Sequence, residues 1–178
     1  MMTAIQMPIA SAPPPDMPFL DLPLPDPAAT EGLGRALARL LRAGDVVALS
    51  GDLGAGKTAL ARALIRALPG PADAPEGADT ATEEVPSPTF TLVQIYERAP
   101  APVWHFDLYR IEDPAEIEEL GFSDALAEGI SLIEWPERLG NRLPAEALHI
   151  VLAFAGEGRH ARLQGGGDWS QRLAELRI

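Results

Sequence analysis

The feature that most constrains the fold of this chain is a glycine-rich segment, GDLGAGKT, at residues 51–58. It fits the spacing G-x-x-x-x-G-K-[ST], in which the backbone N–H groups of a loop surround the phosphates of a nucleotide. Residues 45–50, immediately before it, form a β-branched apolar run of strand length. After it, leucine and isoleucine recur at helical spacing over residues 60–68. Strand, loop and helix therefore follow one another, as a phosphate-binding loop requires.

The loop predicts a nucleotide site in which the positive end of the following helix attracts the phosphates. Lys57, the only lysine of the chain, is expected to bridge the terminal phosphates. The hydroxyl of Thr58 is expected to ligate Mg²⁺. The expected nucleotide contacts of the loop are Asp52, Leu53, Gly54, Ala55, Gly56, Lys57 and Thr58.

A site of this kind also needs a second Mg²⁺ anchor and a group that orients the attacking water, usually a carboxylate at the end of a neighbouring strand. Asp107 ends the apolar run 103–106, and Glu134 ends the apolar run 130–133. The run before Glu134 has the large apolar side chains of a buried central strand, which would bring its carboxylate to the phosphates. The alternative for either residue is a surface acid, since the chain has 26 acidic side chains.

Other polar and aromatic residues near these carboxylates allow two interpretations. A hydroxyl of Ser87 or Thr89 could sense the terminal phosphate, as switch-loop threonines do, or the segment could be a proline turn that enters a strand. We interpret His105 as a partly buried strand residue rather than a ligand. Trp104 and Trp135 are interpreted as packing residues at strand ends rather than as platforms for a base.

Composition narrows the class of function. A formal net charge of -12 argues against strong direct binding to nucleic acid or to an anionic membrane, because binding to either surface needs clustered cations. The chain has no cysteine and three histidines, so that any metal is expected to be bound by oxygen. Residues 1–21 contain a proline cluster but lack the pattern of a secretory signal or a membrane span. We expect a cytoplasmic protein with a disordered, proline-rich tail at 1–21.

The remaining pattern predicts a single α/β domain over residues 22–178. The stretch 69–85 is rich in proline, glycine, alanine and acid, and we expect an exposed, disordered acidic insertion there. The other expected elements are a helix that begins at Asp26 and Pro27 and extends as far as Gly44, a hairpin of 90–97 and 102–109, a helix from Asp113 to Gly121, a strand at 129–135, an antiparallel pair within 147–165 and a short helix from about Asp168. Strands that alternate with helices first and pair antiparallel later indicate a mixed sheet.

Five segments, in this order, resemble the TsaE family of bacterial tRNA threonylcarbamoyladenosine biosynthesis, formerly called the YjeE family of P-loop ATPases. These segments are GDLGAGKT (51–58), SPTFTL (87–92), HFDLYR (105–110), DPAEIEELG (113–121) and IEWPE (133–137). The resemblance covers about residues 22–155. It implies a three-layer P-loop NTPase fold with a mixed, mainly parallel central sheet and antiparallel C-terminal strands.

The same resemblance implies a Mg²⁺-dependent ATPase, weak alone, that works with the TsaB and TsaD proteins and meets tRNA only through that complex. In the family, the residues matching Thr58 and Glu134 hold Mg²⁺, and the one matching Asp107 is required for ATP turnover. Thr89 matches a residue of a switch-like loop, and the segment from Asp26 to Thr30 is expected near the adenine. The chain departs from the family pattern at Ala59, in the insertion and in the proline-rich start.

Three alternative functions require other sequence features. A small-molecule kinase usually carries an arginine-bearing lid, and here only Arg138 and Arg142 come close to such a cluster. A GTPase needs an N-K-x-D pattern, whereas the only asparagine, Asn141, precedes an arginine. A scaffold that uses nucleotide to control association, without obligatory hydrolysis, is the third alternative.

Overall fold

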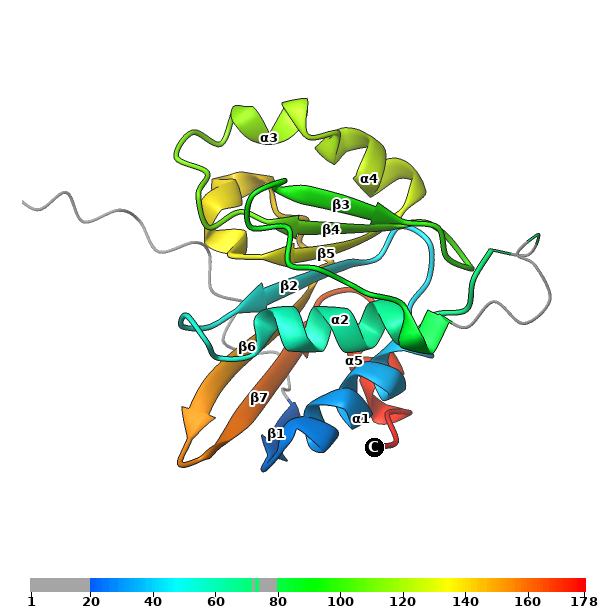
Figure 1. Ribbon diagram of the computed structural model, residues 1–178, viewed down its shortest axis with the longest axis vertical. Helices are drawn as coiled ribbons and strands as arrows, with labels where there is room; N and C mark the ends of the chain where they lie inside the picture. Colours follow the sequence, from blue (N-terminus) through cyan, green and yellow to red (C-terminus); the bar gives the residue numbers. More distant parts are fainter. Residues whose placement is uncertain (1–19, 72, 74–79) are drawn as a thin grey trace, which may run out of the picture.

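A computed structural model describes residues 20–71, 73 and 80–178, and these form one seven-stranded sheet with helices on both faces (Figure 1). The strands are β1 (Leu20–Leu24), β2 (Val46–Ser50), β3 (Val93–Tyr96), β4 (Val103–Asp107), β5 (Ile130–Glu134), β6 (Leu148–Ala155) and β7 (Gly158–Gly165). The helices are α1 (Pro27–Ala38), α2 (Lys57–Ala67), α3 (Glu116–Glu119), α4 (Phe122–Glu128) and α5 (Trp169–Ala174), with the short 3-10 helices η1 (Thr80–Thr82) and η2 (Pro136–Arg142).

The strand order is β1-β7-β6-β2-β5-β4-β3. The four central strands β6, β2, β5 and β4 are parallel to one another, and the outer pairings β1–β7, β7–β6 and β4–β3 are antiparallel. The expected mixed α/β fold is confirmed, including the hairpin β3–β4 and the antiparallel strands β6 and β7 near the end of the chain. Because β2 lies between β5 and β6, the loop that follows it emerges at the middle of the sheet.

Side chains alternate between two hydrophobic cores along the central strands. Val47 and Leu49 of β2 contribute to the core under α1 and α2, whereas Val46 contributes to the core under α3, α4 and η2. On β5 the same alternation places Leu132 in the first core and Ile133 in the second. These cores make the three layers, helices, sheet and helices.

The first strand extends the domain toward the N-terminus. We expected the tail to end at residue 21, but Leu20 and Asp21 belong to β1, which pairs with β7 in the register Leu20↔Leu163. Residues 1–19, the rest of the expected tail, lie outside the described residues. No helix among residues 20–71, 73 and 80–178 is long and apolar enough to cross a membrane.

Helix α1 begins where the sequence predicted and ends earlier. The carboxylate of Asp26 accepts a hydrogen bond from Ala29 N at 2.8 Å, and Pro27 occupies the first turn. The helix ends at Ala38, although the leucine spacing predicted a helix as far as Gly44. Leu41 is still buried, so the apolar spacing is satisfied by a turn that packs against the same core.

The insertion 69–85 is only partly as expected. Residues 72 and 74–79 lie outside the described residues, but the segment 80–85 is anchored on α2. The hydroxyl of Thr80 donates to the backbone oxygens of Arg66 and Leu68, and Val85 is buried. The expectation of a disordered segment is therefore wrong for residues 80–85, because local composition does not show these contacts with another helix.

The segment after β4 forms two short helices where one was predicted. Asp113 N donates a hydrogen bond to Glu116 Oε1 at 3.2 Å, which is half of the expected capping box, but the N-cap of α3 is Ala115, without a side-chain cap. However, α3 spans only four residues. Gly121, at φ 80°, begins α4, a helix that the sequence pattern did not predict. Burial of Phe122 and Ala125 in the second core holds α4 in place.

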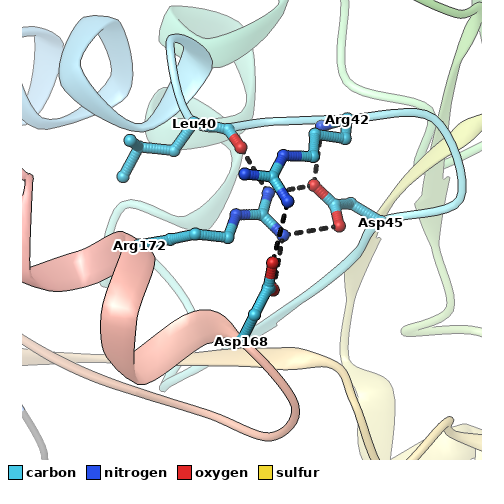
Figure 2. Close-up of polar contacts among 5 residues, drawn as sticks. All are labelled: Leu40, Arg42, Asp45, Asp168 and Arg172. Carbon is cyan, nitrogen blue, oxygen red and sulfur yellow. Dashed lines mark hydrogen bonds and ion pairs between the residues drawn. The ribbon is translucent and has the colours of Figure 1, made fainter.

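Helix α5 is tied to the rest of the domain by an arginine (Figure 2). The guanidinium of Arg172 donates hydrogen bonds to both carboxylate oxygens of Asp45, to Asp168 and to the backbone oxygen of Leu40. Arg42 donates to Asp168 at 2.8 Å from the other side. Hydrogen bonds with Asp45 and Asp168 raise the pKa of Arg172, although burial alone would lower it. We call these residues, Leu40, Arg42, Asp45, Asp168 and Arg172, the C-terminal clamp.

Candidate active site

The glycine loop has the backbone geometry of a close turn between β2 and α2. Gly51 has φ 140°, and a Cβ at this position would lie 2.3 Å from the backbone oxygen of Leu152. Gly56, at φ 106°, is the N-cap of α2, which has no side-chain cap. Glycine is needed at both positions because a positive φ strains other residues. The uncapped N–H groups of α2 are available for an anion.

The side chain of Lys57 is folded back on the loop. It is 4% exposed, and its Nζ donates to the backbone oxygens of Gly51 at 2.7 Å and Asp52 at 2.9 Å. The same Nζ lies 3.8 Å from the centre of the Trp135 ring. Burial lowers the pKa of Lys57, and the nearby carboxylates, Glu134 foremost, oppose that shift. An ammonium in this position is poorly solvated and is suited to an anionic ligand.

Thr58, Glu134 and His105 form a chain of hydrogen bonds beside the lysine. Thr58 Oγ1 donates to Glu134 Oε2 at 2.8 Å. The other oxygen, Oε1, lies 2.8 Å from Nε2 of His105. Glu134 and His105 are 2% and 0% exposed, so both carboxylate oxygens are engaged away from bulk water.

Asp107 forms a second set of contacts in the strand next to Glu134. Its Oδ2 accepts a hydrogen bond from Thr89 Oγ1 at 2.8 Å, and its Oδ1 accepts one from Tyr109 N at 3.1 Å. Thr89 in turn lies 2.8 Å from the hydroxyl of Ser87. Asp107 and Glu134 are register partners in the parallel pair β4–β5. The loop 87–91 is thus tied directly to the strand end that carries Asp107.

A cavity of about 590 Å³ adjoins the loop, within the size range of small-molecule sites. Its lining residues include Thr30 of α1, Gly56 at the N-cap of α2, Arg62 of α2 and Arg159 near the start of β7. Arg159 also donates to the backbone oxygen of Gly54 at 3.2 Å and lies over the ring of Phe154. The cavity therefore extends from the glycine loop toward the start of α1.

The structure brings most of the predicted site residues together. Lys57, Thr58, Asp107 and Glu134 share the carboxyl edge of the parallel strands, and Thr89 reaches Asp107 from its loop. Within the loop, Leu53 is 74% exposed, and Ala55 is buried with its N–H donated to Asp52 O at 3.1 Å. The N–H of Ala55 is therefore used within the loop, whereas we expected it to face the phosphates.

Sequence reasoning missed two residues of the site. His105, interpreted as a partly buried strand residue, is completely buried and contacts Glu134. Its position two residues before Asp107, on the same strand face, was the available signal. Arg159 carried no local signal, because its contact with Gly54 depends on where the β6–β7 hairpin lies relative to the loop.

The donors at this site fit magnesium better than a transition metal. Among the described residues no group of three or more His, Cys, Asp or Glu side chains is arranged to hold a metal. Thr58 and Glu134 offer one hydroxyl and one carboxylate oxygen 2.8 Å apart. Mg²⁺ is commonly bound by one or two protein oxygens together with substrate phosphates and water.

Comparison with known proteins agrees with this geometry. The family model described as "Threonylcarbamoyl adenosine biosynthesis protein TsaE" matches residues 24–162. The chain belongs to the TsaE family. Family membership places it in the biosynthesis of tRNA threonylcarbamoyladenosine. The C-terminal helix α5 lies beyond the residues that the TsaE model matches.

Individual TsaE proteins are similar over most of their length. The chain is 37% identical to the protein of Rickettsia felis over 73% of this chain and 70% of the relative. It is 35% identical to that of Bacillus subtilis, over 74% and 76% respectively. The crystal structure of YdiB from Bacillus subtilis superposes with a TM-score of 0.70 at 27% identity, covering 89% of this chain and 93% of YdiB.

Proposed function

We propose that the chain is a Mg²⁺-dependent ATPase that drives turnover of the TsaB–TsaD complex in tRNA threonylcarbamoylation. The observation that carries this proposal is the convergence of Lys57, Thr58, Glu134, Asp107 and Thr89 at one edge of the sheet. These residues supply a cation, a pair of oxygen ligands for a metal and a carboxylate hydrogen-bonded to a neighbouring loop, which are the parts that phosphoryl transfer needs. Family membership supports the pathway in which the reaction occurs.

The glycine loop and Lys57 would bind the phosphates of ATP. Main-chain N–H groups at the start of α2 face the position of an anion, and Lys57 has little solvation to lose, because it is already buried. The adjoining cavity, lined in part by Thr30 and Arg62, would hold the base and ribose. On this assignment Thr30 is a nucleotide contact remote from the chemistry.

Thr58 and Glu134 would hold Mg²⁺, which neutralises charge on the phosphate oxygens when it is bound. Asp107, on the neighbouring strand, would accept a hydrogen bond from the attacking water and orient it. Its contact with Thr89 means that a change at Asp107 is felt in the loop 87–91. Hydrolysis would in this way alter a segment on the surface.

The surface around the site is suited to a protein partner. Leu53, Phe90 and Phe154 are 74%, 85% and 52% exposed, and each belongs to a segment that contacts or forms the site. Exposed apolar side chains gathered at one place often mark a protein interface. We assign this surface to the TsaB–TsaD complex, through which the chain would meet tRNA without a basic surface of its own.

The test is ATP hydrolysis by the purified chain, alone and with TsaB and TsaD, followed by multiple-turnover threonylcarbamoylation of tRNA. We expect slow hydrolysis alone and faster hydrolysis with the partners, because partner binding can complete the positioning of water. Lys57→Ala and Glu134→Gln should abolish both activities. Glu175→Gln, at an exposed acid just after α5, is the matched control and should leave them intact.

Three results would overturn the proposal. Hydrolysis that survives Lys57→Ala unchanged would contradict the site. Multiple turnover of tRNA modification with a non-hydrolysable ATP analogue would show that the nucleotide controls association only. Transfer of the γ-phosphate to a small metabolite instead of water would indicate a kinase.

A further inference from the structure

His105 is a polar residue buried in a strand of the central sheet. It is 0% exposed, and its Nε2 lies 2.8 Å from Oε1 of Glu134. Within the described part of the chain, its Nδ1 has no hydrogen-bond partner. Burying a ring nitrogen without a partner costs free energy. Glu134 is thus the residue that provides a hydrogen-bond partner for this buried ring.

The strands bring His105 and Glu134 onto one face of the sheet. Along β4, Val103 belongs to the core under α1 and α2, so His105 and Asp107, two and four residues later, point to the same side. Along β5, Leu132 belongs to that core, and Glu134 follows it by two residues. His105 is the register partner of Leu132, one pleat behind the carboxylate.

The two oxygens of Glu134 are therefore divided between two partners. Oε1 is hydrogen-bonded to His105, and Oε2 accepts a hydrogen bond from the hydroxyl of Thr58 at the start of α2. An ionised carboxylate only accepts hydrogen bonds, so Nε2 must carry the proton of this contact. With Oε1 fixed on a buried ring, rotation of the carboxyl group is restricted and Oε2 stays directed at Thr58.

We propose that His105 is a positioning residue, which aligns the Glu134 carboxylate so that Oε2 and Thr58 Oγ1 are ready to receive a divalent cation. This inference rests on the proposed assignment of Thr58 and Glu134 to Mg²⁺. His105 touches neither nucleotide nor metal in this role. Its effect comes from reducing the orientations that the carboxylate must give up on binding. Outer partners of this kind typically contribute ten- to a hundredfold to metal affinity.

Two amide variants differ by one methylene and separate positioning from burial. In His105→Gln the amide nitrogen reaches about as far as Nε2 of histidine, and so it can still donate to Glu134. In His105→Asn the amide ends nearer the backbone, at the level of Nδ1. Both variants keep a buried polar group in β4. Only the glutamine variant is expected to keep the hydrogen bond to Oε1.

The measurement is the affinity of the full chain for a non-hydrolysable ATP analogue, by calorimetry, in EDTA and in saturating MgCl₂. The dissociation constant in EDTA divided by the dissociation constant in MgCl₂ gives the gain in affinity caused by Mg²⁺. We expect His105→Asn to lower this ratio by about tenfold or more, with the affinity in EDTA unchanged, and His105→Gln to restore most of it. Ser131→Ala is the control, since Ser131 is equally buried, lies on β5 and has no partner for its hydroxyl among the described residues.

A double-mutant cycle with Glu134→Gln completes the test. If His105 acts through Glu134, His105→Asn should not lower the ratio further in the Glu134→Gln background. An unchanged ratio in His105→Asn, an equal loss in Ser131→Ala, or a full additional loss in the double variant would each overturn the positioning role. Failure of the proposed function looks different, because the wild-type chain would then bind the analogue no better with Mg²⁺ than in EDTA.

Discussion

The hydroxyl of Thr58 and the carboxylate of Glu134 are joined by a 2.8 Å hydrogen bond, although 76 positions separate the two residues in the sequence. Thr58 lies in the first turn of the helix after the glycine loop, and Glu134 ends the neighbouring parallel strand. The pair is a consequence of the order of strands, since β5 lies directly beside β2. This pair provides two oxygen atoms that could bind a metal, carried by two elements that the sheet holds side by side.

Substitution of Thr58 should separate metal binding from nucleotide binding. We expect Thr58→Val to reduce the gain in ATP affinity caused by Mg²⁺ at least about tenfold, because the variant keeps the shape of the side chain and loses the oxygen. Thr58→Ser keeps the oxygen and should behave like the wild type. Calorimetric titrations with and without Mg²⁺ measure the effect. Equal Mg²⁺ dependence in the valine and serine variants would contradict the assignment.

Asp107 should matter for turnover more than for binding. Its carboxylate is buried and accepts hydrogen bonds from Thr89 and Tyr109 N. Asp107→Asn is nearly isosteric but is a poor proton acceptor, and we expect single-turnover hydrolysis of ATP to fall by roughly 10²–10⁴. Nucleotide affinity, measured in parallel, should change little. A variant that loses binding and turnover together would show that Asp107 supports the site structurally.

The C-terminal clamp should contribute strongly to stability. Arg172 is 6% exposed, and its removal would leave Asp45 without its charged partner. Breaking a buried ion pair by removing one member typically costs about 3–5 kcal/mol, so we expect Arg172→Leu to lower the free energy of unfolding by this amount in denaturant titrations.

Arg35 provides the control for the clamp. It also pairs with an acid at i,i+4 spacing, but the two side chains are 60% and 65% exposed. An exposed pair of this kind contributes less than about 1 kcal/mol. If Arg35→Leu and Arg172→Leu proved equally destabilising, burial of the clamp would not explain its effect.

The sequence correctly predicted those parts of the fold and of the site that depend only on residues close to one another in the chain. The cap at Asp26, the glycine loop and the strand that ends at Glu134 each depend on a few neighbouring residues, and the structure has them where the pattern placed them. The leucine spacing overextended α1 beyond Ala38, because a turn buries Leu41 against the same core. The spacing of the leucines indicates which side chains are buried, but a buried side chain does not have to belong to a helix.

Features that depend on distant contacts could not be predicted in this way. His105 and Glu134 are 29 positions apart, and their contact follows from strand pairing and face. Residues 80–85 have the composition of a free loop but are anchored by backbone oxygens at the end of α2 and at its C-cap, which accept hydrogen bonds from Thr80. Arg172 is an ordinary helix residue by pattern, and its burial arises only when α5 packs beside Asp45.

The clamp should also make stability depend on pH in the acid range. A hydrogen bond from Arg172, aided by the nearby charges of Arg172 and Arg42, lowers the pKa of the Asp168 carboxyl below its ordinary value. A lowered pKa in the folded chain means that this contribution is complete above the unfolded value and is lost as pH falls through the folded value. We therefore expect Asp168→Asn to flatten the decline of the thermal midpoint below about pH 4. Identical pH profiles for both proteins would contradict this.

Lys57 and Trp135 should report nucleotide binding directly. The lysine Nζ lies 3.8 Å from the centre of the Trp135 ring and is held there by the backbone oxygens of Gly51 and Asp52. Phosphate oxygens carry more charge than these carbonyls and should draw the ammonium away from the ring. Because Trp135 is partly exposed, its fluorescence should then change in intensity or wavelength.

The other two tryptophans make the assignment testable. Trp169 is buried under Arg172 of the clamp, and Trp104 stacks on Phe106 in the core under α3 and α4, so neither is expected to respond. A fluorescence titration with ATP and Mg²⁺ should therefore give a signal in the wild type that disappears in Trp135→Phe, while calorimetry still detects binding. A signal of the same size in Trp135→Phe would show that the response comes from another tryptophan, and the link between Lys57 and Trp135 would fail.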